Sequence, residues 1–358
     1  MSQFKIIHII SSLNRGGKER QLSIICKNST KIDNQIIYFN KTQSNYISEY
    51  KIGDKVTQLK SKNFFKRLFD TFIICRQQKP DAIGTWGMME SIFGLITTSV
   101  LHIPMINFSV RHGIRKNKLA HRFRTFLLHL SKNIVANSRA GLKANHLAEG
   151  FVLYNGIGNI PAPIDAEKKN ELKFKRLTQK NTIILISVAN LVPYKDYFTV
   201  LKALKEIKEK GYNFYYLIIG DGPNRKEIEN LIKQYQLSNN IKLTGRISDV
   251  DYYLETADIM IHSSLGEGCS NAILEGMKHG LPIIATDVGG NPEITTEVTA
   301  FLFDYGDKNK LIDLLVKLIT DKSLRKKMGR NSYQIIKNKF TINKMIANYE
   351  EYILKTIK

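Results

Sequence analysis

The sequence predicts an α/β protein that is built from two doubly wound domains. Its 358 residues are too many for one ordinary hydrophobic core, which suggests two. Short apolar runs alternate with helical patterns along the chain, and this alternation is typical of βαβ units and of parallel sheets. The runs form two series, and the stretch between them holds two prolines followed by a charged run. We therefore expect a domain boundary near residues 158–180.

Both series can be divided into individual strands. The first contains strand candidates at residues 4–10, 34–40, 54–59, 82–86, 103–110, 133–138 and 151–156. The second contains candidates at 182–190, 214–222, 240–245, 257–264, 281–288 and 300–306. Ligands in open α/β sheets bind outside the carboxyl ends of the strands, so the loops that follow these strands are where we expect a site.

The last residues, 341–358, predict an amphipathic helix. Apolar side chains recur there near a period of 3.6 residues. They are Ile342, Met345, Ile346, Tyr349, Tyr352 and Ile353.

The chain is strongly basic, and the charge is uneven. Residues 1–158 carry 24 Lys and Arg against 8 Asp and Glu, whereas residues 159–358 carry 30 against 24. A basic half favours anionic partners, which are nucleic acid, an anionic membrane face or phosphorylated substrates. The alternative interpretation is a Lys-rich composition that is spread over solvated faces.

The chain is expected to stay in the cytoplasm. No apolar run approaches the ~18 residues of a membrane span, and the run at 4–10 is too short for a signal segment. Cys26, Cys75 and Cys269 show neither paired nor metal-ligand spacing, which fits a reducing compartment.

Residues 267–275, EGCSNAILE, place two carboxylates eight positions apart around a predicted helix start. Ser270 or its neighbour is a plausible N-cap after the strand at 257–264. Backbone N–H groups at a helix N-terminus bind anions, so residues 270–272 predict a diphosphate site. Glu267 would reach a group beyond the phosphates and Glu275 a group behind them, as a sugar and a ribose would require. The alternative is a capped helix with two solvated glutamates.

This E-x7-E pattern, followed by GMKHGLPIIATDVGGNPE, resembles the retaining GT-B glycosyltransferases of family 4. The resemblance extends to SVANLVPYKD (187–196), LIIGDGPNR, residues 241–264 and VLYNGI (152–157). It also includes SLNRGGKERQL (12–22) and two acceptor-side segments, GTWGMMESIFGLI and INFSVRHGI. It covers nearly the whole chain and is stronger over 182–305 than over 1–150.

The resemblance implies two Rossmann-like domains that face a cleft. Residues 1–160 would form the acceptor-side domain, residues 161–340 the nucleotide-sugar-binding domain, and residues 341–358 a helix that packs back on the first domain. The implied reaction moves a hexosyl or N-acetylhexosaminyl group, with retention, from a nucleotide-diphosphate donor, first of all a UDP-sugar. The acceptor would be a glycan or a polyprenyl-diphosphate-linked glycan of a bacterial surface polysaccharide, such as capsule or O-antigen. No cofactor and no metal are expected.

The resemblance also implies roles for individual residues. Glu275 would bind the ribose, Glu267 the donor sugar and Lys195 the leaving diphosphate. His112, Glu267 and Lys195 are the expected catalytic residues. The expected donor-binding residues are Gly16, Gly17, Asn190, Lys195, Arg246, Ile247, Glu267, Gly268, Cys269, Ser270, Asn271, Ala272 and Glu275.

Two further points belong to these assignments. Trp86 and Arg111 are expected on the acceptor side, although core packing is an equal interpretation for Trp86. Many members of the family carry an Arg where this chain has Asn190. Either fewer cations then meet the diphosphate, or a basic residue elsewhere, such as Arg15 or Lys18, replaces the missing one.

Other patterns leave alternatives open. Asp249 and Asp251 fit the metal-binding D-x-D of a different glycosyltransferase fold, but the residues that follow favour a helix cap. Residues 63–76 and 116–132 gather Phe and Leu side chains on one helical face, flanked by Lys and Arg. These segments are either core-facing helices or contacts with an anionic bilayer, which would hold the protein on the inner face of the plasma membrane.

Two other functions compete with this one. A UDP-sugar epimerase would keep the fold and the nucleotide site. A basic, non-enzymatic nucleic-acid-binding protein would explain the charge, but the chain lacks the interleaved aromatic residues and recognisable modules of that class, so no nucleic acid is expected.

Overall fold

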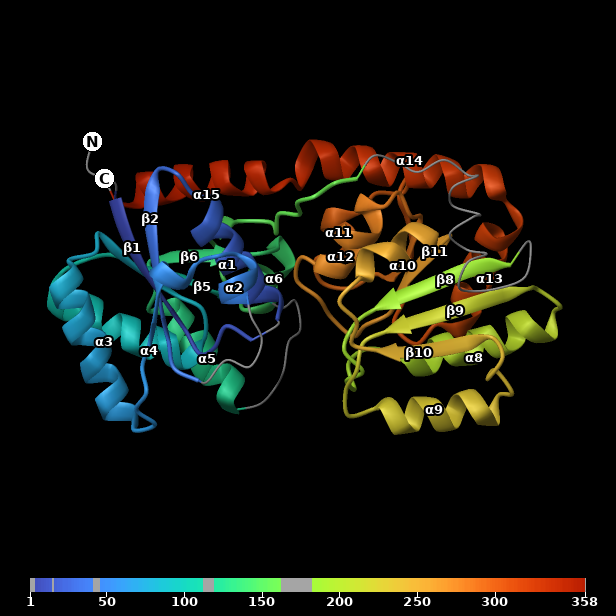
Figure 1. Cartoon of the computed structure of the whole chain (residues 1–358), viewed down its shortest axis with the longest axis horizontal. Helices are drawn as coiled ribbons and strands as arrows, with labels where there is room; N and C mark the ends of the chain where they lie inside the picture. The colour runs from blue at the N-terminus through green and yellow to red at the C-terminus, as the bar shows by residue number, and fades with distance from the viewer. Residues whose placement is uncertain (1–3, 15, 41–45, 112–118, 162–181, 358) are drawn as a thin grey trace. The chain divides into compact units, whose positions relative to one another are not determined.

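The computed structural model describes residues 4–14, 16–40, 46–111, 119–161 and 182–357, which divide into two compact units (Figure 1). Unit 1 consists of Met1–Gly156 and Ile342–Lys358, and unit 2 of Ile157–Thr341. Each unit contains one parallel sheet with helices around it. The predicted α/β class with two doubly wound domains is therefore confirmed. Along the chain, the boundaries between the units lie at residues 156/157 and 341/342, whereas the expected limits were 160/161 and 340/341.

The sheet of unit 1 has the strand order β3-β2-β1-β4-β5-β6-β7. Its strands are β1 (Phe4–Ile10), β2 (Ile32–Tyr38), β3 (Val56–Gln58), β4 (Ala82–Thr85), β5 (Met105–Val110), β6 (Asn133–Ala136) and β7 (Phe151–Val152). Its helices are α1 (Gly17–Asn28), α2 (Tyr46–Glu49), the 3-10 turn η1 (Gly53–Lys55), α3 (Phe64–Gln78), α4 (Met88–Leu101), α5 (Leu119–His129), α6 (Arg139–Ala144) and α15 (Ile342–Ile357). Every strand predicted in the first series is present.

Alternation along β1 assigns the two faces of this sheet, because successive side chains of a strand point to opposite sides. Ile6 and Ile10 pack in a cluster with apolar residues of α1 and α15. Ile7 and Ile9 pack in another cluster with Cys75 of α3 and Phe93 of α4. Helices α1 and α15 thus cover one face, and α3 and α4 cover the other.

Helix α15 is fixed to unit 1 by buried polar groups as well as by its apolar stripe. The hydroxyl of Tyr349 donates to Oδ1 of Asn34 and lies 3.2 Å from Nε2 of His8. Nε1 of Trp86 donates to Nδ1 of His8 over 3.1 Å, so the ring proton of His8 is on Nε2, 3.0 Å from Oδ1 of Asn34. Burial lowers the pKa of His8 to about 4, so the ring is neutral.

Glu350, the next residue along α15, is also buried. Its Oε1 accepts hydrogen bonds from the hydroxyl of Ser29 (2.8 Å) and from the backbone N–H groups of Thr30 (2.8 Å) and Lys31 (2.9 Å). One carboxylate thereby holds the turn between α1 and β2. The amphipathic helix predicted for the chain end is confirmed, and it carries a polar anchor inside its apolar stripe.

The sheet of unit 2 has the strand order β10-β9-β8-β11-β12-β13. Its strands are β8 (Ile183–Val188), β9 (Phe214–Ile219), β10 (Ile241–Gly245), β11 (Ile259–His262), β12 (Ile283–Thr286) and β13 (Ala300–Phe303). Its helices are α8 (Tyr197–Glu209), α9 (Arg225–Gln234), α10 (Val250–Thr256), α11 (Asn271–Lys278), α12 (Asn291–Ile294), α13 (Lys308–Thr320) and α14 (Lys322–Lys339). All strands predicted in the second series are present. Most of the charged run that separates the two series falls on residues 162–181, outside the described part of the chain.

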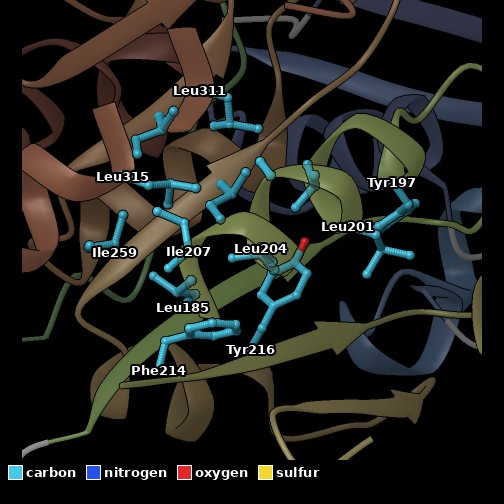
Figure 2. Close-up of a cluster of buried hydrophobic side chains, with 14 of the residues drawn as sticks. Leu185, Tyr197, Leu201, Leu204, Ile207, Phe214, Tyr216, Ile259, Leu311 and Leu315 are labelled. Atoms are coloured by element: carbon cyan, nitrogen blue, oxygen red, sulfur yellow. The ribbon is translucent and has the colours of Figure 1, made fainter. Parts of the chain in front are cut away.

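The core of unit 2 lies between its sheet and helices α8 and α13. Figure 2 shows Leu201, Leu204 and Ile207 of α8 beside Leu185 of β8, with Leu311 and Leu315 of α13 in the same cluster. This packing buries β8, a central strand of the sheet. No helix in the described residues is both long and apolar enough to cross a bilayer.

Candidate active site

Strands β8 and β11 are neighbours at the point where the strand order of the sheet in unit 2 reverses. From β8 the chain proceeds through β9 to β10, and from β11 it proceeds the opposite way through β12 to β13. Open α/β sheets bind ligands outside the carboxyl ends of their strands at such a reversal. Here the N–H of Asp196 donates to Ser263 O (3.0 Å), and that of Leu265 donates to Tyr194 O (2.8 Å). The segment 187–196 is thus joined to the residues that directly precede the segment 267–275.

A lysine, a glutamate and a histidine form a compact cluster there. Nζ of Lys195 donates to Oε1 of Glu267, and Nε2 of His262 lies 3.1 Å from the same oxygen. Nε2 of His262 also lies 3.3 Å from Nζ of Lys195 and 3.2 Å from the hydroxyl of Ser270. The side chains of Lys195 and Glu267 are only 11% and 13% exposed, so this ion pair is largely withdrawn from water.

The cluster determines the charge of its members. Burial lowers the pKa of His262, and the charge of Lys195 lowers it further, so the imidazole is neutral at pH 7. Burial alone would raise the pKa of Glu267, but Lys195 and His262 outweigh it and hold that pKa well below its usual range. The site therefore presents one carboxylate and one cation beside a neutral ring.

Helix α11 begins next to this cluster. Ser270 is its N-cap, and the Ser270 hydroxyl accepts from the N–H of Ile273 over 3.4 Å, as the sequence predicted. The first N–H groups of a helix have no acceptor within the helix, and the helix dipole adds positive potential at that end. Asn271 and Ala272 are the first two residues of α11. This helix start is therefore suited to a diphosphate.

The two glutamates of EGCSNAILE lie on either side of that helix start. Glu267 is in the loop before α11, whereas Glu275 is half-buried in the second turn of the helix. The carbonyl of Glu267 accepts from the N–H of Gly290 over 3.2 Å. Gly289 has φ +55°, and a side chain there would collide with the same carbonyl. The glycine pair after β12 thus lets its loop approach and hold the Glu267 loop.

Gly268 and Cys269 complete this loop, and both are buried. Cys269 forms no disulfide bond. Asn190 is exposed in the loop after β8. Arg246 is exposed and Ile247 half-buried directly after β10, two strands away from β8 in the same sheet. All these expected donor-binding residues therefore follow the carboxyl ends of strands of unit 2.

The remaining expected residues belong to unit 1. Gly16 is the N-cap of α1, and Gly17 is its first residue. Nζ of Lys18 donates to the carbonyl of Trp86 over 3.1 Å, which ties the start of α1 to the end of β4. His112 and Arg15 fall outside the described residues.

The expected acceptor contact of Trp86 needs correction. The indole is 1% exposed, stacks on Phe108 at 4.8 Å between ring centroids, and has the guanidinium of Arg111 4.5 Å from its own centroid. Its Nε1 donates a hydrogen bond to Nδ1 of His8. Both faces of the ring are thus covered, and Trp86 packs in the core. Arg111 is half-buried, donates from Nε to the carbonyl of Phe108, and stays an expected acceptor contact.

Asp249 and Asp251 play structural roles. Asp249 caps α10 by accepting from the N–H of Tyr252 at 3.2 Å, so the predicted helix cap is confirmed. Oδ1 of Asp251 lies 2.8 Å from both Nζ of Lys278 and Nε2 of His279. Hydrogen bonds from these two side chains lower the pKa of Asp251. Within the ranges that the structure describes, no group of three or more His, Cys, Asp or Glu side chains could hold a metal ion.

Two residues of the site were not predicted. His262 joins Lys195, Glu267 and Ser270, and its signal in the sequence was a histidine that ends an apolar strand beside the motif. Asp196 caps α8 through the N–H of Thr199 (3.0 Å) and accepts from the hydroxyl of Ser263 (3.3 Å). Asp196 thereby fixes the loop that carries Lys195.

Known proteins resemble this chain in sequence and in fold. Residues 168–335 match the family model described as glycosyl transferases group 1. A curated relative, the UDP-Gal:alpha-D-GlcNAc-diphosphoundecaprenol alpha-1,3-galactosyltransferase of Escherichia coli, is 27% identical over 82% of this chain and 80% of its own. The capsular polysaccharide biosynthesis glycosyltransferase CapM of Staphylococcus aureus is 25% identical over 77% of each chain.

A solved structure of HepE from Anabaena, in complex with UDP, has a TM-score of 0.86. It is 19% identical and covers 98% of this chain and 100% of its own. At that identity the likeness shows the fold, which has the two parallel-sheet units described above. Residues 168–335 therefore carry a domain of the glycosyl transferases group 1 type, and the chain as a whole has the GT-B fold.

Proposed function

We propose that the chain is a retaining, metal-independent enzyme that transfers a sugar from a UDP-sugar to a glycan or a polyprenyl-diphosphate-linked acceptor in surface polysaccharide biosynthesis. The observation that carries this proposal is the cluster of Lys195, Glu267 and His262 beside the start of α11, at the reversal point of the sheet in unit 2. The names of the relatives support the substrate class. One names a UDP-Gal donor and a diphosphoundecaprenol acceptor, and another names capsule biosynthesis.

Lys195 and the start of α11 stabilise the leaving diphosphate in this proposal. Negative charge on the diphosphate grows as the bond to the sugar breaks, so a fixed cation and aligned N–H groups stabilise the transition state more than the ground state. Together they supply the positive charge that a bound metal would otherwise supply. Because Lys195 has a long side chain, its Nζ can move from Glu267 to the diphosphate when the donor binds.

Glu267 then becomes available to the donor sugar. Its carboxylate keeps the contact with His262 after Lys195 has turned to the phosphates, so it stays positioned to accept hydrogen bonds from sugar hydroxyls. Glu275, within α11, takes the ribose hydroxyls on the other side of the diphosphate. The ion pair between Lys195 and Glu267 is thus exchanged for a contact of each side chain with the donor.

The test is a reaction of the full-length protein with a panel of nucleotide sugars and a lipid-linked acceptor extract. We expect UDP release that depends on acceptor, a product with the same anomeric configuration as the donor, and unchanged turnover in excess EDTA. An inverted product would contradict the retaining mechanism. Loss of turnover that manganese or magnesium restores would contradict metal independence. UDP or an epimerised sugar formed without acceptor would favour the epimerase instead.

The proposed place of this reaction is the inner face of the plasma membrane. A polyprenyl-linked acceptor stays in the bilayer, and the enzyme must therefore come to it. The excess of Lys and Arg in residues 1–158 supports attraction to anionic lipids.

A further inference from the structure

Unit 1 exposes apolar side chains over one group of helices. In its described residues, every large apolar side chain that is exposed lies on α3, α4 or α5 or directly after α5. They are Phe64, Phe65, Phe69, Met88, Met89, Ile96, Val100, Phe123, Phe126 and Leu130. Phe65 is 76% exposed and Phe69 61%, so these rings are not parts of the core that merely reach its edge. We call this set of ten side chains the apolar face.

Helix α4 forms the middle of the apolar face. It contacts both α3 and α5, so the three helices are neighbours on the same side of the sheet (Figure 1). Its sequence, MMESIFGLITTSVL, has a single charged residue, Glu90, and that residue is buried. The water-facing side of α4 therefore carries no charge. A surface helix of a soluble protein is normally polar on that side, and a contiguous exposed apolar patch marks a binding surface.

Basic residues flank the apolar face on the side of α3 and on the side of α5. Residues 60–79 and 119–132, which contain α3 and α5, carry nine Lys and Arg and one acidic residue, Asp70. Lys62, Lys66 and Arg122 among them are exposed. An apolar centre with a cationic rim matches an anionic bilayer, where apolar side chains enter the boundary below the headgroups and cations meet the phosphates. The same rim disfavours a second copy of this chain, because two such faces would repel each other.

We propose that the apolar face docks unit 1 onto an anionic lipid bilayer, with Phe65, Phe69, Phe123 and Phe126 entering the headgroup–acyl boundary. The face begins at Met88 and Met89, at the carboxyl end of β4. That edge of the sheet also carries Arg111, the expected acceptor contact, directly after β5. Docking therefore brings the acceptor side of unit 1 to the membrane surface. The biological reason for this docking rests on the proposed function, whereas the exposed apolar and basic side chains that support it do not.

The test is cosedimentation of the full-length protein with vesicles of phosphatidylcholine, with and without phosphatidylglycerol. We expect binding to the anionic vesicles that high salt reverses, and weak binding to the neutral ones. Phe65→Ser with Phe69→Ser should lower the partition coefficient by about tenfold or more, because two exposed rings no longer enter the bilayer. Lys62→Glu with Lys66→Glu should lower it by at least about 30-fold, since each cation near an anionic surface contributes a factor of about five.

Matched controls come from unit 2. Val298→Ser removes an exposed apolar side chain, and Lys322→Glu with Lys326→Glu makes the same change of charge on α14. Neither should change the partition coefficient, if docking uses the apolar face. Equal binding of the wild type to neutral and anionic vesicles would overturn the proposal. So would unchanged binding of both face variants, or a dimer in solution that Phe65→Ser with Phe69→Ser makes monomeric.

UDP binding, measured by calorimetry, separates this inference from the proposed function. The face variants should bind UDP as the wild type does, because the substitutions are in unit 1 and the proposed nucleotide site is in unit 2. Loss of vesicle binding with normal UDP binding supports docking. Vesicle binding by a wild type that does not bind UDP would support docking and contradict the proposed function.

Discussion

Oε1 of Glu267 contacts both Nζ of Lys195 and Nε2 of His262, and this shared contact gives the two glutamates of EGCSNAILE different environments. Spacing alone allowed two solvated glutamates. The structure instead shows unequal ones, since Glu267 is nearly buried in a charged cluster and Glu275 is half-buried in the second turn of α11. Residues this different in environment are expected to act on different parts of a donor.

The pair predicts a separation between nucleotide binding and turnover. A hydrogen bond to a charged group contributes about 1.5–3 kcal/mol, so its loss costs about 10- to 150-fold. Glu275→Ala should weaken the binding of free UDP by that factor, because the ribose is part of UDP and its contact does not need the transferred sugar. Glu267→Ala should leave UDP affinity nearly unchanged and lower turnover. Calorimetry with UDP and steady-state rates measure both, and an equal loss of UDP affinity in the two variants would disprove the two-sided interpretation.

A separate prediction concerns the charge of Lys195 and its effect on kcat. Lys195→Met keeps the length of the side chain and removes its charge, so kcat should fall by about 100-fold or more, as for the loss of one donor to a developing charge. Lys202→Met, at an exposed position of α8, is the control and should have little effect. Similar rates for the two variants would show that the diphosphate is neutralised elsewhere.

At the scale of elements, the sequence predicted more of the strands than of their polar connections. All strands of the two sheets were recognised from the sequence, because buried parallel strands are short apolar runs between turn signals. The role of Glu350 was missed because its partners, Ser29 to Lys31, lie about 320 residues earlier in the chain. His262 was missed for a similar reason, since only the fold brings Lys195 to it. For Trp86 an acceptor contact and core packing stayed equal interpretations, because the sequence does not show that Phe108 and Arg111 cover its ring.

The turn between α1 and β2 gives a stability prediction. Glu350→Ala leaves a buried hydroxyl and two backbone N–H groups without their acceptor, so unit 1 should lose about 3 kcal/mol of unfolding free energy or more. Glu351→Ala, at the adjacent position where the side chain is 64% exposed, should leave the unfolding free energy nearly unchanged. Urea unfolding of both variants provides the comparison, and equal effects would show that the buried carboxylate is not an anchor.

His8 links β1 with β2, β4 and α15, and it predicts how unit 1 responds to acid. Burial lowers its pKa from 6.5 to about 4, so below pH 6.5 the unfolded chain binds more protons than the folded one. The stability from this group is therefore complete above pH 6.5 and is lost as the pH falls toward 4, by about 3 kcal/mol in total. His8→Gln should lower stability at pH 7 and flatten this slope. Urea unfolding between pH 4 and 7 measures it, and an unchanged slope would contradict the assignment.

At the scale of the whole molecule, unit 1 is made from two distant parts of the chain. Met345, Ile346, Tyr349 and Ile353 of α15 complete the hydrophobic cluster on one face of its sheet. Unit 2, in contrast, is one continuous segment with a core of its own. The two units should therefore differ in how they tolerate shortening of the chain.

A chain that ends at Thr341 tests this difference. Loss of four buried apolar side chains costs unit 1 a few kcal/mol each, which together matches the roughly 5–15 kcal/mol that stabilises a whole domain. Unit 1 should then unfold, while unit 2 keeps a cooperative thermal transition whose midpoint UDP raises. Calorimetric scans with and without UDP show the outcome, and two intact transitions in the shortened chain would contradict it.

The packing of α15 on unit 1 also has a consequence for folding during synthesis on the ribosome. Unit 2 accounts for the 185 residues Ile157–Thr341, all of which are made after Gly156 and before α15. At about 5–20 residues per second, their synthesis takes roughly 10–40 s. During that time the nascent sheet of unit 1 exposes the apolar surface that α15 later covers. Translation therefore makes unit 2 the first part that can fold completely, although it comes second in the sequence.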